Sequence, residues 1–323
     1  MVIEADKLNQ KPRRCFASMN FINRNLRNLG IAFIAVVIGM AAASAFGQEK
    51  AKAEKMEKAE KADKTEHKEM ASGFCQNNNW SSDDKVSFNE LRETTVAAGG
   101  TIAVDAGKNG GVSVRGENRS DVLIRACVQA WGRTAEEARA TAGAIRIGTT
   151  SAITADGPDS KEMGWSVSYQ LLVPRSTNLK LTAHNGGISI SDVEGTSEFE
   201  TMNGGVNLSN VSGDVKGRTM NGGVNVSLAG SSWKGSGLDV TTTNGGVHIS
   251  MPENYAAHVE TGTVNGGYSS DIPALNITTE DIKGSYGRSR ARTISTNLNG
   301  GGAPIKVTTT NGGVRISSQN TKE

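Results

Sequence analysis

The chain has 323 residues and a formal charge of +2 at pH 7, from 35 Lys and Arg against 33 Asp and Glu. This length allows a large buried core. A nearly neutral chain has no long-range attraction for polyanions, so we expect no nucleic-acid partner.

Residues 1–47 have the pattern of an export signal. Arg24 and Arg27 precede the uncharged run 29–45, and the segment 43–47 offers the small residues that signal cleavage prefers. The run is slightly shorter than the ~20 residues of a spanning helix. This favours a cleaved signal over the alternative, a single-pass membrane anchor through residues 29–45. We therefore expect an exported protein, located in the periplasm, at the cell surface or secreted.

A charged spacer and a cap segment follow. Residues 48–72 contain almost only Lys, Glu, Ala and a few polar residues, without an apolar period, which is typical of a helical or disordered spacer. Residues 73–87 are interpreted as an N-terminal cap that contains Cys75. The strand expected at 122–130 points Cys127 away from the main core, so Cys75 could reach it and form a disulfide in an oxidising compartment. The alternative is two free thiols.

The first half of the folded domain mixes strands with one short helix. Thr134-Ala-Glu-Glu137 is a capping box that predicts a helix through about Ala142, with Gly143 placed to end it. Asn109-Gly-Gly-Val112 has the form of an early repeat, and the same motif recurs after the helix. We therefore predict one continuous domain over 88–320. The strands expected before residue 180 are 101–104, 112–114, 122–130, 145–147 and 166–173.

An Asn-Gly-Gly motif recurs through the second half of the chain. Its asparagines are Asn185, Asn203, Asn221, Asn244, Asn265 and Asn311. The steps between them are 18, 18, 23, 21 and 46 residues, and the last step is about two repeats with a degenerate copy at Asn299. Apolar residues alternate with polar ones on both sides of the motif, which is the period of a strand with one buried face. Each repeat is therefore predicted to be a strand, an Asn-Gly-Gly corner and a second strand.

Asn-Gly is also typical of hairpins, so an antiparallel meander is the alternative to a parallel solenoid. The side chains five residues before each Asn are Lys180, Glu198, Lys216, Asp239, Glu260 and Lys306. In a solenoid these side chains stack ~4.8 Å apart, where the alternating signs of the first four attract. Corner asparagines can form an amide ladder only in such a stack. We therefore predict an all-β fold, a parallel β-helix or solenoid of about 18–23-residue rungs with one short helix inserted in its N-terminal part.

Several motifs in a fixed order resemble a known family. They are the segment Leu172-Val-Pro-Arg-Ser-Thr-Asn-Leu-Lys-Leu181 before the repeats, His248-Ile-Ser-Met-Pro252, and Gly300-Gly-Gly-Ala-Pro304 before the last repeat. Over roughly 88–320 the chain resembles the bacterial putative-adhesin domain family of unknown function, and more distantly the head domains of surface adhesins. The resemblance implies an exported, single-chain, β-helix-like domain. That family has no established catalytic residues to carry over.

No catalytic, cofactor-binding or metal site is predicted from the residues. The histidines His67, His184, His248 and His258 have no metal-ligand spacing with a carboxylate or thiolate. Nucleophile-elbow and Walker motifs are absent from the sequence. A β-helix enzyme acting on carbohydrate would need clustered carboxylates, or an Arg or Lys base beside a Ca²⁺ site. The outward positions are instead mostly Ser, Asn, Thr and single charges, so we expect neither enzyme activity nor a cofactor.

Binding is the favoured function. The position two residues after the second Gly of each motif is polar in every repeat. The residues are Ser189, Asn207, Asn225, His248, Ser269 and Arg315. With the charged column these residues would form one flat polar face that contacts glycans or proteins; the alternative is a face that only keeps the solenoid soluble. We expect an exported, adhesin-like envelope or surface binding module whose partner is a polysaccharide or an envelope or surface protein. The alternatives are a structural or stress-related periplasmic component and, less favoured, a carbohydrate-active enzyme.

Overall fold

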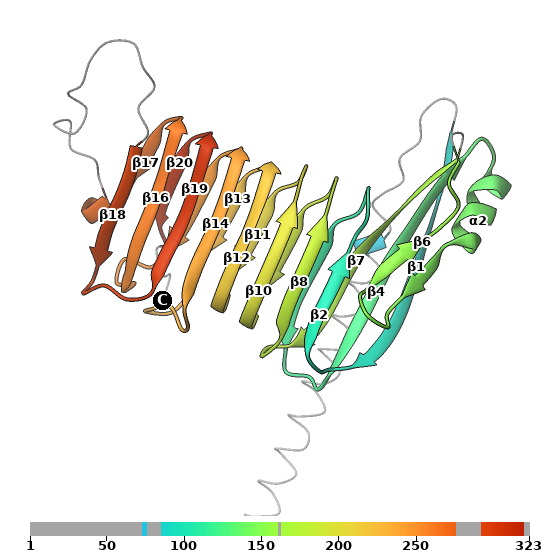
Figure 1. Cartoon of the computed structure of the whole chain (residues 1–323), viewed down its shortest axis with the longest axis horizontal. Helices are drawn as coiled ribbons and strands as arrows, with labels where there is room; N and C mark the ends of the chain where they lie inside the picture. The colour runs from blue at the N-terminus through green and yellow to red at the C-terminus, as the bar shows by residue number, and fades with distance from the viewer. Residues whose placement is uncertain (1–72, 76–84, 161–162, 276–291, 320–323) are drawn as a thin grey trace, which may run out of the picture. The chain divides into compact units, whose positions relative to one another are not determined.

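The computed structural model describes residues 73–75, 85–160, 163–275 and 292–319. The predicted signal 1–47 and spacer 48–72 lie outside these residues. The described part of the chain is dominated by two large sheets that contain parallel strands, with a short helix, α2 (Ala135–Ala144), in its N-terminal part (Figure 1). The prediction of an all-β fold with parallel strands is confirmed.

Two large sheets and one small one contain the strands. The ten-stranded sheet has the spatial order β1 (Val86–Ala97), β4 (Asp121–Gly132), β7 (Gly164–Pro174), β3 (Val112–Glu117), β9 (Ile188–Ser191), β11 (Val206–Ser209), β13 (Val224–Ser227), β15 (Val247–Met251), β20 (Val314–Ser318) and β17 (Tyr268–Ser270). The eight-stranded sheet has the order β18 (Arg292–Leu298), β16 (Ala257–Asn265), β19 (Pro304–Asn311), β14 (Gly237–Asn244), β12 (Ser212–Asn221), β10 (Glu194–Thr201), β8 (Asn178–Ala183) and β2 (Thr101–Asp105). The remaining elements are the hairpin of β5 (Arg146–Gly148) with β6 (Thr154–Asp156) and the 3₁₀ helix η1 (Pro273–Leu275).

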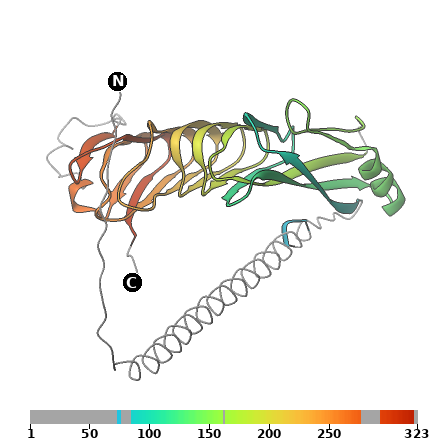
Figure 2. The same cartoon turned by 90° about the horizontal axis from the view of Figure 1, so that it is seen from below.

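Each repeat contributes one strand to each large sheet. The chain follows a strand of the eight-stranded sheet, turns at the Asn-Gly-Gly corner and continues in the ten-stranded sheet, so β8 leads to β9 and β10 leads to β11 (Figure 2). Neighbouring repeats pair in parallel and in register, with Ser197 opposite Val215 and Val206 opposite Val224. An antiparallel meander would not give this pairing. We call the repeats that pair in this way in both sheets the stack.

The core is formed by the inward side chains of the two sheets. Burial alternates along the strands, so that in β10 Phe199 and Thr201 are buried while Glu198 and Glu200 are exposed. Apolar side chains before and after each corner meet in one continuous cluster. Removal of this apolar surface from water is the main force that holds the two sheets together.

A buried threonine and a close backbone approach shape each corner. The Thr201 hydroxyl donates to the Gly186 carbonyl at 2.7 Å, and the Thr219 hydroxyl donates to the Gly204 carbonyl at 2.8 Å. A Cβ added to Gly204 would overlap the Gly186 carbonyl oxygen. This close approach explains why a glycine directly follows the corner Asn in each repeat.

The order of the repeats in the stack differs from their order in the chain. The degenerate copy expected at Asn299 is not a corner, and this prediction was wrong. Asn299 has a left-handed backbone, with φ of 48°, and begins a run of positive-φ residues that turns the chain from β18 to β19. The last repeat, β19 and β20, then lies between the repeat of β14 and β15 and the repeat of β16 and β17.

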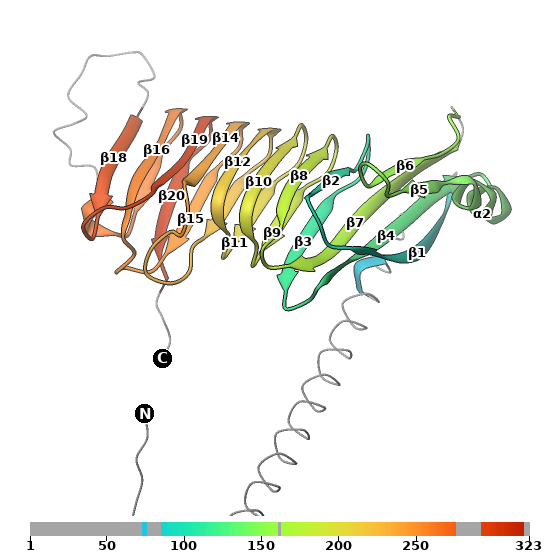
Figure 3. The same cartoon turned by 60° about the horizontal axis from the view of Figure 1, so that its bottom comes forward.

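The N-terminal strands continue the ten-stranded sheet, and helix α2 packs on β1 and β4 (Figure 3). As predicted, Thr134 caps the helix; its hydroxyl accepts from the Glu137 backbone N–H at 3.2 Å. Gly143 does not end the helix, which continues to Ala144. The reason is that the Arg92 guanidinium donates to the carbonyls of Ala142 at 2.9 Å and Ile145 at 2.7 Å, so these carbonyls at the helix end are satisfied without a glycine cap.

Candidate functional site: the outer face of the eight-stranded sheet

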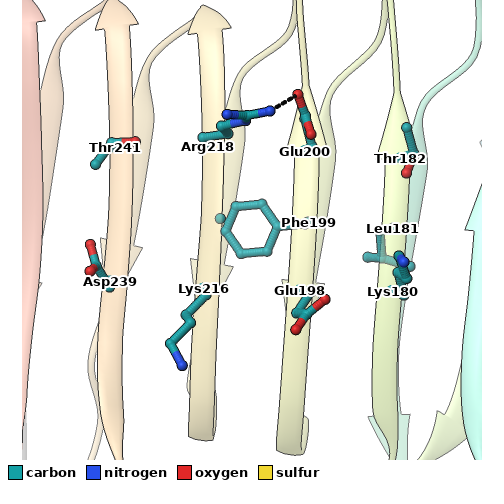
Figure 4. Close-up of a pocket in the computed structure, with 11 residues that line it drawn as sticks. Lys180, Leu181, Thr182, Glu198, Phe199, Glu200, Lys216, Arg218, Asp239 and Thr241 are labelled. Atoms are coloured by element: carbon teal, nitrogen blue, oxygen red, sulfur yellow. Dashed lines mark hydrogen bonds and ion pairs between the residues drawn. The ribbon is translucent and has the colours of Figure 1, made fainter.

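The outer face of the eight-stranded sheet carries two rows of exposed polar side chains. They alternate with the buried residues of each strand, so one strand contributes a member to each row. The parallel register keeps the rows straight across β8, β10, β12 and β14 (Figure 4). We call this set the charged face: Lys180, Thr182, Glu198, Glu200, Lys216, Arg218, Asp239 and Thr241.

Opposite charges alternate along the first row across the six strands from β8 to β16. Because β19 is inserted between β14 and β16, Lys306 lies opposite both Asp239 and Glu260. The order along the sheet is therefore Lys180, Glu198, Lys216, Asp239, Lys306, Glu260. In chain order Asp239 would have met Glu260, so the insertion completes the alternation that the sequence showed only for the first four positions.

Some of the charged side chains on this face form ion pairs with one another. Arg218 Nη2 lies 2.7 Å from Glu200 Oε1, and Lys306 Nζ lies 4.0 Å from Asp239 Oδ2. Lys216 Nζ pairs with Asp214 of its own strand at 3.0 Å. The face thus offers alternating charges without a net charge, so it does not attract polyanions at a distance.

Three depressions follow one another across this side of the sheet. The central one, about 470 Å³, is lined by all the residues of the charged face together with Leu181, Phe199 and Gly217. It shares Thr182 and Glu200 with a depression of about 490 Å³ that reaches Asp105 and Lys108, and Thr241 with one of about 300 Å³ over β14, β19 and β16. Together they form a shallow path perpendicular to the strands.

Phe199 and Gly217 form the middle of this path. Phe199 is 5% exposed, and a Cβ added to Gly217 on the neighbouring strand would overlap its ring. Because Gly217 has no side chain, the Phe199 ring can occupy the space beside it (Figure 4). This pair was not identified from the sequence, although Leu181, Phe199 and Gly217 each stand four residues before the corner Asn of successive repeats.

The corner asparagines come together in one amide ladder, which also includes Asn109. From Asn185 onward, the side-chain amide of each member donates to the side-chain carbonyl of the member before it in the stack, at 2.7 to 3.0 Å. The ladder follows the order of the stack, since Asn311 donates to Asn244 and accepts from Asn265. The members in order are Asn109, Asn185, Asn203, Asn221, Asn244, Asn311 and Asn265.

The prediction of one polar face was wrong, because its two sets of residues lie on the outer faces of two different sheets. The chain passes to the other sheet at each corner, so the positions after the glycines lie on the ten-stranded sheet and not beside the charged column. These positions are Ser189, Asn207, Asn225, His248, Arg315 and Ser269, in the order of the sheet. There Asn225 donates to Asn207 at 2.9 Å, and His248 Nε2 lies 2.9 Å from Ser317 Oγ.

The histidines and cysteines considered in the sequence do not form one cluster among the described residues. His184 lines the depression beside Lys108, whereas His258 contacts Asn297 and Ser295 on β18. His67 lies outside the described residues. Among the residues that the structure describes, no group of three or more His, Cys, Asp or Glu could hold a metal ion. Cys75 and Cys127 form a disulfide, with their Cα atoms 5.3 Å apart.

Comparisons with known proteins place the chain in a family. No curated protein matches it by sequence. Among solved structures, the crystal structure of a putative cell adhesion protein from Clostridium sporogenes matches 71% of this chain and 100% of its own, with 10% identity and a TM-score of 0.36. A search of the described residues for a helix long and apolar enough to cross a membrane found none. The family model described as Toastrack DUF4097 matches residues 137–317, more than half of the chain. The chain belongs to the Toastrack DUF4097 family.

Proposed function

We propose that this protein is an exported, non-catalytic, adhesin-like binding module of the cell envelope or surface, and that its stack is a β-solenoid. The observation that carries the proposal is the path of contiguous depressions across the charged face. A site that spans several strands suits an extended ligand laid perpendicular to them.

The chemistry of the path favours a ligand with many hydrogen-bonding groups. Thr182 and Thr241 contribute hydroxyls, and charges of opposite sign recur with each strand, ~4.8 Å apart. Such a surface can donate to and accept from sugar hydroxyls, or match a mixed-charge protein segment, without repelling either. We therefore propose an envelope polysaccharide, or an envelope or surface protein, as the partner.

Two features support export. Residues 1–47 have a charged start, an apolar run and small residues at the expected cleavage zone. The Cys75–Cys127 disulfide joins residues 52 apart, a bond of the kind that persists in oxidising compartments.

The second candidate, a structural envelope component, is favoured by the internal pairing of the charges. Arg218 with Glu200 and Lys306 with Asp239 already satisfy one another. On this hypothesis the charged rows serve the stability of the sheet and not a ligand.

Binding of the full-length protein to immobilised envelope polysaccharide and to envelope protein separates the two candidates. The test variant is Arg218→Glu, and the matched control is Arg315→Glu on the outer face of the other sheet. We expect Arg218→Glu to weaken binding about tenfold, the effect of losing one central charged contact, while Arg315→Glu leaves it unchanged. Absence of binding by the unmodified protein, or an equal loss in both variants, would contradict a ligand site on the charged face.

A further inference from the structure

The C-terminal segment Arg292–Ser318 pairs with strands of two other repeats, β14–β15 and β16–β17, at the end of the stack. It forms β18, crosses over, and continues as β19 and β20. β18 and β19 pair with opposite edges of β16, and β19 also pairs with β14. We call Arg292–Ser318 the C-terminal clasp, because it encloses β16 and joins that strand to the rest of the sheet.

Among the described strands, β16 and β17 pair with the stack only through the clasp. The residue before β16, Ala256, also forms an isolated parallel bridge with Ser232, in the connection from β13 to β14. β16 pairs with β18 and β19, and β17 pairs with β20. Removal of the clasp would leave open edges on β14 and β15, which are templates for another strand.

The side chains on β14 and β16 favour β19 of the clasp between these two strands over direct pairing of β14 with β16. Lys306 lies between Asp239 and Glu260, and Asn311 connects Asn244 to Asn265 in the ladder. If β16 closed directly on β14, Asp239 would face Glu260, and like charges directly opposite are destabilising. The position is therefore built to receive a strand that carries a lysine here.

The same contacts do not depend on which molecule supplies the clasp. If a second copy supplied the clasp, its strands would make the same ladder bonds and the same buried contacts, through Ile305, Val307, Val314 and Ile316. Residues 276–291 separate η1 from the clasp, and sixteen residues of chain reach up to ~50 Å when extended. Exchange of an identical element between protomers creates no new interface at the exchanged site and loses none of its contacts.

We propose that the gap between the β14–β15 repeat and the β16–β17 repeat is a binding site for the clasp of a second copy of this chain, so that two molecules exchange clasps and form a dimer. The inference stands apart from the proposed ligand site, because it involves backbone edges and not the charged face.

The test uses the register pair His248 and Arg315, on β15 and β20. Two full-length variants, His248→Cys and Arg315→Cys, each with Cys15→Ser, are unfolded together without reductant at mildly acidic pH, where thiol exchange is slow. They are refolded at a series of concentrations and treated with a short bismaleimide. The single-chain double variant His248→Cys/Arg315→Cys shows that the geometry permits the link. The matched control mixes Asn207→Cys with Asn225→Cys, a register pair on β11 and β13 that clasp exchange leaves within one chain.

We expect a cross-linked heterodimer from the His248→Cys and Arg315→Cys mixture. In the dilute limit its fraction should rise about tenfold with each tenfold rise in concentration, as mass action requires. The control mixture should give no concentration-dependent heterodimer. Exchange is overturned if the test mixture yields no more heterodimer than the control while the double variant links internally. It is equally overturned if both mixtures link alike, since that marks general aggregation.

Discussion

At the scale of single residues, the corner asparagines are the most regular contacts in the protein. Asn221 donates to Asn203 at 2.7 Å and accepts from Asn244 at 2.8 Å, whereas Asn265, at the end of the ladder, makes one ladder bond, to Asn311. The described ladder thus contains members with two bonds and members with one.

The substitution Asn221→Ala should therefore destabilise the protein more than Asn265→Ala. With a net value of about 0.5–1.5 kcal/mol for each hydrogen bond, Asn221→Ala should lower the free energy of unfolding by about 1–3 kcal/mol, and Asn265→Ala by about half as much. Urea unfolding of the two variants measures the difference. Equal losses would show that the ladder adds nothing beyond the corner itself.

Phe199 and Gly217 provide a second test at this scale. Gly217→Ala places a methyl group where the Phe199 ring lies, and such overpacking should cost about 1–3 kcal/mol. Adding Phe199→Leu should recover part of that loss, since the smaller side chain leaves room. Gly99→Ala is the matched control, because no atom lies within 4 Å of its added Cβ. If Gly217→Ala were as mild as the control, the described packing of the ring would be wrong.

At the scale of elements, the position of β19 is the feature that distinguishes this stack. Lys306 and Asp239 are neighbours in space although they are 67 positions apart in the chain. A double-mutant cycle with Asp239→Asn and Lys306→Met should give a coupling of about 0.2–1 kcal/mol, the usual range for exposed ion pairs. The same cycle with Asp239→Asn and Glu260→Gln should show no coupling. The reverse result would mean that the repeats stack in chain order.

Part of this element-level structure follows from the sequence. The alternation around each Asn-Gly-Gly motif predicts two strands and a corner, and the charges of Lys180, Glu198, Lys216 and Asp239 predict a parallel stack. The place of the last repeat could not be derived, because its Asn, Thr and apolar positions match those of the other repeats. The charges of Glu260 and Lys306 carried the missing signal, since only the inserted order alternates their signs with Asp239.

The candidate site was only half predicted for a related reason. The charged column was identified, but the second row with Glu200 and Arg218 was not, and Ser189, Asn207 and Arg315 were assigned to the same face. A corner that passes the chain from one sheet to the other preserves the period of two along the sequence. The pattern alone therefore does not separate the two outer faces.

At the scale of the whole molecule, two buried tyrosines, Tyr169 and Tyr255, and the half-buried Tyr268 predict sensitivity to alkali. Burial raises the pKa of Tyr255 and of Tyr268 to about 12, and it also raises the pKa of Tyr169. The unfolded chain releases these protons near pH 10, whereas the folded protein holds them. This contribution to stability is complete below about pH 10 and is lost as the pH rises toward 12.

The urea concentration at the midpoint of unfolding should be lower at about pH 11 than at about pH 8. The tyrosinate absorbance contributed by Tyr169, Tyr255 and Tyr268 should increase together with unfolding and not before it. Ionisation of these three tyrosines near pH 10 in the folded protein would contradict the raised pKa values of Tyr169, Tyr255 and Tyr268.

The proposal of an exported surface module is tested most directly by trypsin treatment of intact cells, with mass spectrometry of the released fragments and of the mature N-terminus. The spacer 48–72 is rich in lysine, so trypsin should release fragments of the 85–319 region if they lie outside. We predict that such fragments appear from intact cells and that the mature chain begins near Phe46 or Gln48. Protection until the envelope is opened would contradict a surface role, and a chain that retains residues 1–45 would contradict signal cleavage.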